Sequence, residues 1–295
     1  MIYTVTLNPA IDHIVTLPSF SAGTLNRAST EAFRFGGKGI NVSLVLKELG
    51  FPSVALGFIA GFTGEALENG VKAKGITTDF IRVAGETRIN TKVSSNAEET
   101  ELNGVGPTVT EADFEALLCK VKQLDSNDIL VLSGSLAPGL PPDAYFRLAA
   151  AVNPGVRVVV DTAGAPLKAA LAAKPWLVKP NEAELRELYG EGEVRTLAKK
   201  AQELGARNVL CSRGKSGAIL LCEDGSESDV AAPLGTVKST VGAGDSLLAG
   251  FLAAAESGKS PAEALKYGVA AGSATAFSVG LADKTKINAA LAAMK

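Results

Sequence analysis

The stretch Thr240-Val-Gly-Ala-Gly-Asp-Ser246 runs directly into the small apolar segment 247–255, which we predict to be a helix. Two glycines just before its first turn let backbone N–H groups converge at the positive end of the helix dipole, which makes a seat for an anion. Asp245 lies beside this seat. It either caps the helix or removes a proton from a hydroxyl that attacks a phosphoryl group held there.

Composition bounds the kind of protein. The 295 residues, 46% of them hydrophobic and 31 of them glycine, fit one large α/β domain or one domain with a small appendage. A net charge of −2 without a basic cluster predicts no nucleic-acid partner. No apolar window long enough to span a bilayer occurs, and the three cysteines lack metal-type spacing. We therefore expect no membrane partner and a cytoplasmic location.

The order of predicted elements gives the architecture. Strands and helices alternate over 36–83 and again over 111–212, which predicts a doubly wound, mostly parallel sheet with helices on both faces. Two stretches without helices, 11–35 and 88–105, each form a predicted strand pair and together a four-stranded β lid over a cleft. The remaining segments form the α/β core: 1–10, 36–87 and 106–295. Ligands of such sheets bind beyond the carboxyl ends of the strands.

A second glycine-rich helix entrance lies at Gly36-Gly-Lys-Gly-Ile-Asn41. The chain has neither a P-loop nor a Gly-x-Gly-x-x-Gly after a strand, which argues against a dinucleotide-dependent oxidoreductase. Two anion seats remain, one with Lys38 and one with Asp245. A kinase that acts on a phosphorylated small molecule needs such a pair, one seat for the transferred phosphate and one for the phosphate of the acceptor.

Together these two entrances resemble the motifs of the ribokinase-like (PfkB) carbohydrate kinases, over essentially the whole chain. Five further motifs narrow the resemblance to the branch with the 1-phosphofructokinases and tagatose-6-phosphate kinases: Thr6-Leu-Asn-Pro-Ala-Ile-Asp12, Gly85-x-Thr-Arg-Ile-Asn90, Ser133-Gly-Ser-Leu-x-Pro-Gly139, Lys179-Pro-Asn-Glu-x-Glu184 and Gly272-Ser-Ala-Thr-Ala276. The resemblance implies a phosphotransferase that uses ATP and Mg²⁺ on a ketohexose monophosphate. Fructose 1-phosphate, giving fructose 1,6-bisphosphate, is the first choice, and tagatose 6-phosphate is the alternative.

The resemblance also implies roles for single residues. Asp245 is the expected base, and the γ-phosphate is expected at the N–H groups of Gly242, Ala243 and Gly244. The sugar phosphate is expected at Asp12, Gly37, Lys38, Asn41, Arg88, Asn90 and Ser135. The nucleotide is expected at Lys179, Asn181, Ser212, Gly214, Gly217, Gly242 and Gly244. Magnesium is expected to be held through water by Asn181 and Glu184.

Plainer interpretations remain open for several of these residues. Asn181 and Glu184 have the spacing of a capping box, which the sequence does not separate from a metal site. Asp12 is also compatible with a turn after Pro9. Lys38 and Arg88 are also compatible with solvated surface positions.

Two other functions fit the same fold. A noncatalytic sugar-phosphate sensor needs no base at the seat, so Asp245 argues against it. A nucleoside kinase would leave Lys38 and Arg88 without a phosphate. Arg213 and Lys215 have no assigned role and are expected to lie in solvent. An apolar outer face of the lid predicts a homodimer through the lid.

Overall fold

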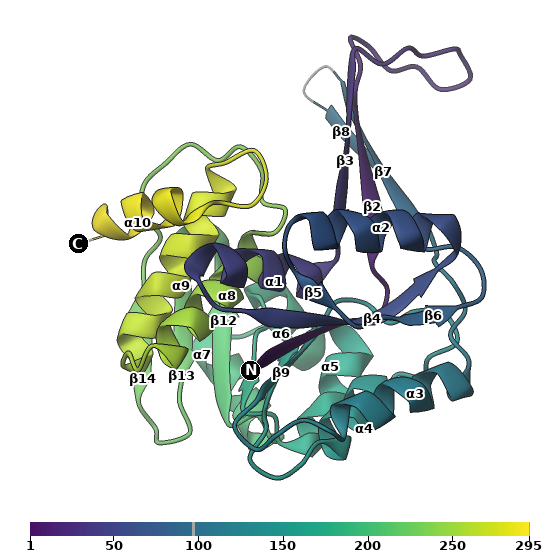
Figure 1. Cartoon of the computed structure of the whole chain (residues 1–295). Coiled ribbons are helices and arrows are strands. Elements are labelled where there is room, and N and C mark those ends of the chain that lie inside the picture. The colour runs from purple at the N-terminus through teal and green to yellow at the C-terminus, as the bar shows by residue number, and fades with distance from the viewer. Residues whose placement is uncertain (96–97, 295) are drawn as a thin grey trace.

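The computed structural model describes residues 1–95 and 98–294 and contains a large and a small sheet (Figure 1). The large sheet is built from β1 (Ile2–Thr6), β4 (Ser53–Ala60), β5 (Thr77–Thr78), β6 (Ile81–Val83), β9 (Ile129–Ser133), β10 (Arg157–Asp161), β11 (Leu177–Val178), β12 (Asn208–Ser212), β13 (Ala218–Leu221) and β14 (Glu227–Val230). Its order is β14-β13-β12-β11-β10-β9-β1-β4-β5, with β6 also paired to β4. From β5 to β12 neighbouring strands are parallel, and β12, β13 and β14 are antiparallel. The predicted mostly parallel sheet is confirmed.

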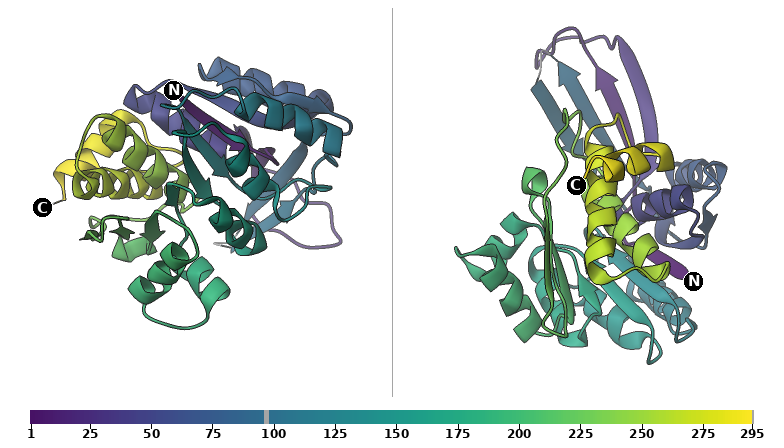
Figure 2. Two further views of the ribbon diagram at one scale, coloured as in Figure 1. Left: turned by 90° about the horizontal axis from the view of Figure 1, so that it is seen from below. Right: turned by 90° about the vertical axis from the view of Figure 1, so that its left-hand side faces the viewer.

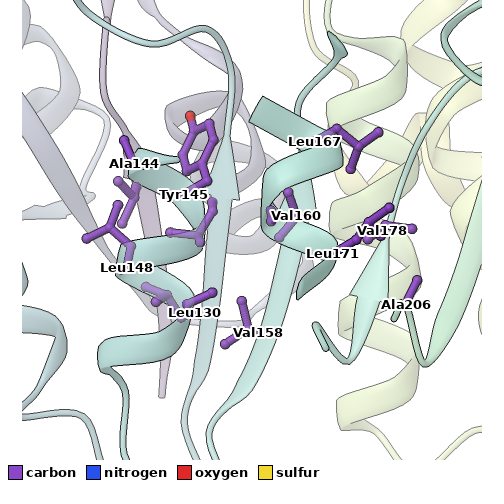
Figure 3. Close-up of a cluster of buried hydrophobic side chains, with 14 of the residues drawn as sticks. Leu130, Ala144, Tyr145, Leu148, Val158, Val160, Leu167, Leu171, Val178 and Ala206 are labelled. Carbon is purple, nitrogen blue, oxygen red and sulfur yellow. The ribbon is translucent and has the colours of Figure 1, made fainter. Parts of the chain in front are cut away.

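Helices cover both faces of this sheet (Figures 1 and 2). Successive side chains of a strand enter opposite layers, so the apolar interior of β10 contributes to both. Val158 and Val160 thus pack in one cluster and Val159 in the other. The first cluster, part of which Figure 3 shows, lies under α3 (Glu111–Val121), α4 (Ala144–Ala151), α5 (Gly164–Ala170), α6 (Glu182–Tyr189) and α7 (Val194–Glu203). The second lies under α1 (Lys38–Leu49), α8 (Ala243–Glu256), α9 (Pro261–Ala276) and α10 (Lys284–Ala292).

The small sheet is the predicted lid. Its strands are β2 (Ala10–Thr16), β3 (Thr30–Gly36), β7 (Arg88–Ser95) and β8 (Glu98–Asn103), in the order β3-β2-β7-β8. The central pair is parallel and the two outer pairs are antiparallel. This sheet projects from the core beside α2 (Gly61–Ala73) (Figures 1 and 2). Residues 96 and 97 of the predicted lid segment 88–105 lie outside the described residues.

Glycines fix the position of α1 on the sheet. A Cβ atom on Gly37, whose φ is 140°, would lie 2.5 Å from Cγ2 of Thr6. The start of α1 therefore lies directly on the carboxyl end of β1. The helix ends at Gly50 with a φ of 92°, the left-handed C-terminal conformation that glycine adopts readily.

Among the described residues, none of the helices combines the length and the apolar character that a membrane span requires.

Candidate active site

The predicted ligand-binding residues gather where the lid meets the carboxyl edge of the large sheet. A cavity of about 980 Å³ opens beside them, between the lid, α1 and α2. Of the predicted site residues, Asp12 on the lid, Asn41 on α1 and Gly242 before α8 line it. The lid and both glycine-rich helix entrances thus border one space. A cavity of this size accommodates small-molecule ligands.

The start of α8 provides the anion seat. Gly242, in the left-handed region with a φ of 77°, occupies the N-cap position, and no side chain caps the helix. The Ala243 N–H donates to the Thr240 carbonyl at 3.2 Å. Of the three expected donors, only Gly242 and Gly244 have N–H groups without a hydrogen-bond partner among the described residues. These two remain available to a bound anion.

Asp245 lies in the first turn of α8 and does not cap it. Its Oδ2 instead accepts a hydrogen bond from Nδ2 of Asn41 at 2.8 Å. The capping interpretation is therefore wrong. Burial and the nearby negative charge of Asp161 raise the pKa of Asp245 to about 6, against the hydrogen bond from Asn41 and the charge of Lys179. A carboxylate with a pKa near neutrality suits a general base.

Asp161 is a central residue that the sequence analysis missed. It ends β10, is 1% exposed, and its Oδ1 lies 3.2 Å from Nζ of Lys38 and 3.2 Å from Nζ of Lys179. Burial alone would raise the pKa of Asp161, but the two ammonium groups outweigh it and lower this pKa. The Lys38 side chain is 39% exposed, but its ammonium group is paired with Asp161 at the site. The available signal was an acidic residue at the end of an apolar strand, at the edge where ligands bind.

Further polar lid residues lie close to Asp12. Asn90 donates from Nδ2 to Oδ1 of Asp12 at 3.1 Å, which couples two of the expected sugar ligands across the β2–β7 pair. Arg88, at the start of β7, donates from Nε to the carbonyl of Asn8 at 3.2 Å. Burial lowers the pKa of Arg88, and the charge of Asp12 opposes that effect. Ser135 is exposed in the loop that follows β9.

The expected nucleotide residues lie at the neighbouring strand ends. A Cβ atom on Gly244 would lie 3.3 Å from Nζ of Lys179, so this lysine reaches the anion seat. Asn181 pairs with Ser212 in an isolated parallel bridge. Gly214 and Gly217 both have positive φ values in the turn after β12. The structure therefore brings these residues to one edge of the sheet.

Asn181 and Glu184 form a capping box at the start of α6. The Glu184 N–H donates to Oδ1 of Asn181 and the Asn181 N–H donates to Oε2 of Glu184, both at 2.8 Å. Oε1 of Glu184 has no hydrogen-bond partner among the described residues. The capping box leaves that oxygen free, so a water-mediated metal role is compatible with it. The described residues contain no group of three or more His, Cys, Asp or Glu side chains placed to hold a metal directly.

Arg213 departs from the expectation of a solvated side chain. Its side chain is only 18% exposed because it forms an ion pair with Asp229 on β14 and donates to the Ser216 carbonyl at 3.2 Å. It thereby ties the turn after β12 to the β13–β14 hairpin. Lys215 is exposed, as predicted.

The comparisons with known proteins agree with this geometry. The family model "pfkB family carbohydrate kinase" matches residues 5–288. A 1-phosphofructokinase of Bacillus subtilis is 44% identical, over 94% of this chain and 93% of its own length. A D-tagatose-1-phosphate kinase of Bacillus licheniformis is 39% identical, over 98% of this chain and 96% of its own length.

Solved structures agree with the fold as well. Phosphofructokinase-2 from Escherichia coli, in complex with substrates and products, superposes with a TM-score of 0.93 at 32% identity and covers 99% of both chains. Ribokinase from Thermotoga maritima, at 22% identity, shares the fold with a TM-score of 0.82 over 99% of both chains. The family match, the curated relatives and the arrangement of the two helix entrances all lead to one conclusion: this chain belongs to the pfkB family of carbohydrate kinases.

Proposed function

We propose that the chain transfers the γ-phosphoryl group of ATP to the 6-hydroxyl of fructose 1-phosphate, giving ADP and fructose 1,6-bisphosphate. The observation that carries this proposal is the carboxylate of Asp245, which is buried at the start of α8 and hydrogen-bonded to Asn41 at the entrance of α1. It lies between the two anion seats, where a hydroxyl must lose its proton as it attacks phosphorus.

In the proposed reaction Asp245 accepts the proton of the attacking hydroxyl. The hydroxyl oxygen bonds to the γ-phosphorus, and the bond from that phosphorus to the bridging oxygen of ADP breaks. The N–H groups of Gly242 and Gly244 receive the negative charge of the transferring group. Lys38 and Lys179 add positive charge, and both are held in place by Asp161. The donors are therefore fixed before the substrates arrive.

Magnesium is part of the proposal. When bound, Mg²⁺ would neutralise the charge on the phosphate oxygens of ATP. Two carboxylate oxygens at the site fit a hydrated hard cation, Oε1 of Glu184 and the buried, unpaired Oδ2 of Asp161. We assign these two residues and Asn181 to the metal and its water shell. A kinase that consumes ATP also suits the cytoplasmic location that the sequence predicts.

A second candidate substrate is tagatose 1-phosphate, which the name of the Bacillus licheniformis relative favours. Like fructose 1-phosphate, it is a ketohexose 1-phosphate with a free 6-hydroxyl, so the same base and seats serve it. Tagatose 6-phosphate, the alternative from the sequence, presents its phosphate at the opposite end of the sugar.

Product formation across a substrate panel tests the proposal. Purified protein with Mg-ATP is offered fructose 1-phosphate, tagatose 1-phosphate, tagatose 6-phosphate, fructose 6-phosphate, fructose and a nucleoside, with the Asp245→Asn variant alongside. We expect the highest kcat/KM with fructose 1-phosphate and its loss in the variant. Binding of sugar phosphates without any turnover would instead support the sensor function.

We further propose that the protein is a homodimer through its lids. The supporting observation is the lid face opposite to Asp12 and Asn90. Phe33, His13, Thr91 and Leu102 form one cross-strand row on that face, because each pairs in register with the next. Phe33 is 56% and Leu102 61% exposed. Large exposed apolar side chains on a sheet with two free edges favour pairing with another copy.

A further inference from the structure

Asn8 lies where three segments meet at the base of the lid. It follows β1, is 6% exposed, and its Nδ2 donates to the carbonyls of Val105 at 3.1 Å and Leu136 at 3.4 Å. Val105 follows the last lid strand, and Leu136 lies beside Ser135 in the loop after β9. One amide group therefore joins the entrance of the lid, its exit and the loop expected to bind the sugar.

Arg88 is held at the same junction. Its Nε donates to the carbonyl of Asn8 at 3.2 Å and its Nη1 to the carbonyl of Gly104 at 3.5 Å. Nη2 makes no hydrogen bond among the described residues, which leaves it available to a phosphate. The guanidinium that we expect at the sugar phosphate thus has its position set by the two ends of the lid.

The junction is also tight. Gly106 has a φ of 91°, and a Cβ atom there would lie 2.3 Å from Oδ1 of Asn8. That Oδ1 is buried without a hydrogen-bond partner, as are Oδ1 of Asn90, Oγ of Ser133 and Oδ2 of Asp161. These are four of the seven such side-chain atoms among the described residues, so the unpaired groups concentrate at this site.

We propose that Asn8 is a positioning residue for phosphoryl transfer. Its amide fixes the lid and the loop 133–139 to each other, so that Arg88 and Ser135 meet the sugar phosphate in one geometry and water stays out of the closed site. Asn8 itself touches no reacting atom. The kinetic part of this inference rests on the proposed function, because it names fructose 1-phosphate as the substrate. The claim that Asn8 joins the three segments rests on the contacts at the junction alone.

The test compares Asn8→Ala and Gly106→Ala with Asn208→Ala. Asn208 is a matched control because it is equally buried, at 8% exposure, and makes two backbone hydrogen bonds: its amide donates to the Trp176 carbonyl, and its Oδ1 accepts from the Glu223 N–H. It is the first residue of β12, so it lies at the amino ends of the parallel strands, whereas the site lies at their carboxyl ends. Kinetics with Mg-ATP and fructose 1-phosphate are recorded by measuring ADP and sugar bisphosphate separately.

For both junction variants we expect KM for the sugar phosphate to rise roughly ten- to hundredfold, with KM for ATP within about twofold of the wild-type value. ADP should also exceed sugar bisphosphate, because water competes with the sugar in a site that no longer closes. The Asn208→Ala variant should keep the wild-type KM values and equal amounts of the two products. The proposal fails if Asn8→Ala behaves like Asn208→Ala.

Hydrogen exchange separates this inference from the choice of substrate. If Asn8 joins the segments, Asn8→Ala should accelerate exchange of backbone amides in 104–106 and in 133–137 together, without any ligand present. Asn208→Ala should leave both segments unchanged. Unchanged exchange in Asn8→Ala would overturn the junction even in a fully active kinase. Absence of turnover with every sugar phosphate would overturn the proposed function and leave the exchange result to decide on the junction.

Discussion

At the scale of single residues, Asp245 combines burial with a function that requires charge. Because its pKa is raised from 3.8 to about 6, the folded protein must ionise a buried carboxyl above pH 6 that the unfolded chain ionises near pH 4. This carboxyl therefore destabilises the folded state at pH 7, by on the order of 2–3 kcal/mol, and has no such effect below about pH 4. The cost is tolerated at a site that needs a base.

The first prediction is that Asp245→Asn lowers the activity and raises the stability of the folded protein at pH 7. We expect kcat to fall by roughly 10²- to 10⁴-fold, because the base is lost. The urea midpoint at pH 7 should rise, because asparagine removes the ionisation cost and its Oδ1 still accepts from Asn41. The gain should vanish at pH 4. Equal midpoints of variant and wild type at pH 7 would contradict the burial argument.

The second prediction concerns pH. The kcat/KM of the wild type should fall as the pH drops below about 6, because protonated Asp245 no longer accepts a proton. Asp161→Asn removes a negative charge that raises this pKa, so the acid limb of the profile should move to lower pH. Glu203→Gln, which removes one negative charge from the exposed end of α7, is the control and should leave the limb in place. A limb that does not move in Asp161→Asn would show that another group titrates.

At the scale of elements, the two helix entrances were predictable because glycine runs and apolar spacing are local signals. The helix predicted over 247–255 and the two predicted lid segments lie within a few residues of the observed elements. What the sequence did not reveal are pairings across elements. That Lys38 and Lys179 share Asp161, and that Arg213 meets Asp229, depends on which strands are neighbours, and a charged residue alone does not specify its partner.

The third prediction separates the two glycines at the start of α8. Gly242→Ala should lower the free energy of unfolding by roughly 1–2 kcal/mol, because φ is 77° and the new Cβ would lie 2.6 Å from Cδ2 of Leu281. Gly244→Ala occupies a helical position, so it should leave stability unchanged or higher. Its methyl group lies at the anion seat, 3.3 Å from Nζ of Lys179. We therefore expect Gly244→Ala to lower kcat/KM for ATP without lowering the urea midpoint.

At the scale of the whole molecule, the lid has two unlike faces. Asp12 and Asn90 lie on one face of the lid, whereas Phe33 and Leu102 lie on the other, because side chains alternate along each strand. Phe33, on the edge strand β3, also lines the cavity. Catalysis accounts for the polar face alone. Within one chain, the described residues leave both Phe33 and Leu102 exposed, so the apolar face calls for a separate explanation.

The fourth prediction is that pairing of two lids explains this face. The wild type should elute as a dimer at micromolar concentration in size-exclusion chromatography with light scattering. Phe33→Glu and Leu102→Glu should each give monomers, because a dimer would bury the new carboxylates against an apolar surface. Leu234→Glu is the control, since Leu234 is fully exposed outside the lid and its variant should remain dimeric. If the wild type is a monomer, the proposed dimer does not exist. If both lid variants remain dimeric, the dimer interface does not lie on this face of the lid. If the lid variants are monomeric yet keep their KM for the sugar phosphate, each subunit closes its own site, and the junction at Asn8 positions the lid without help from a second copy.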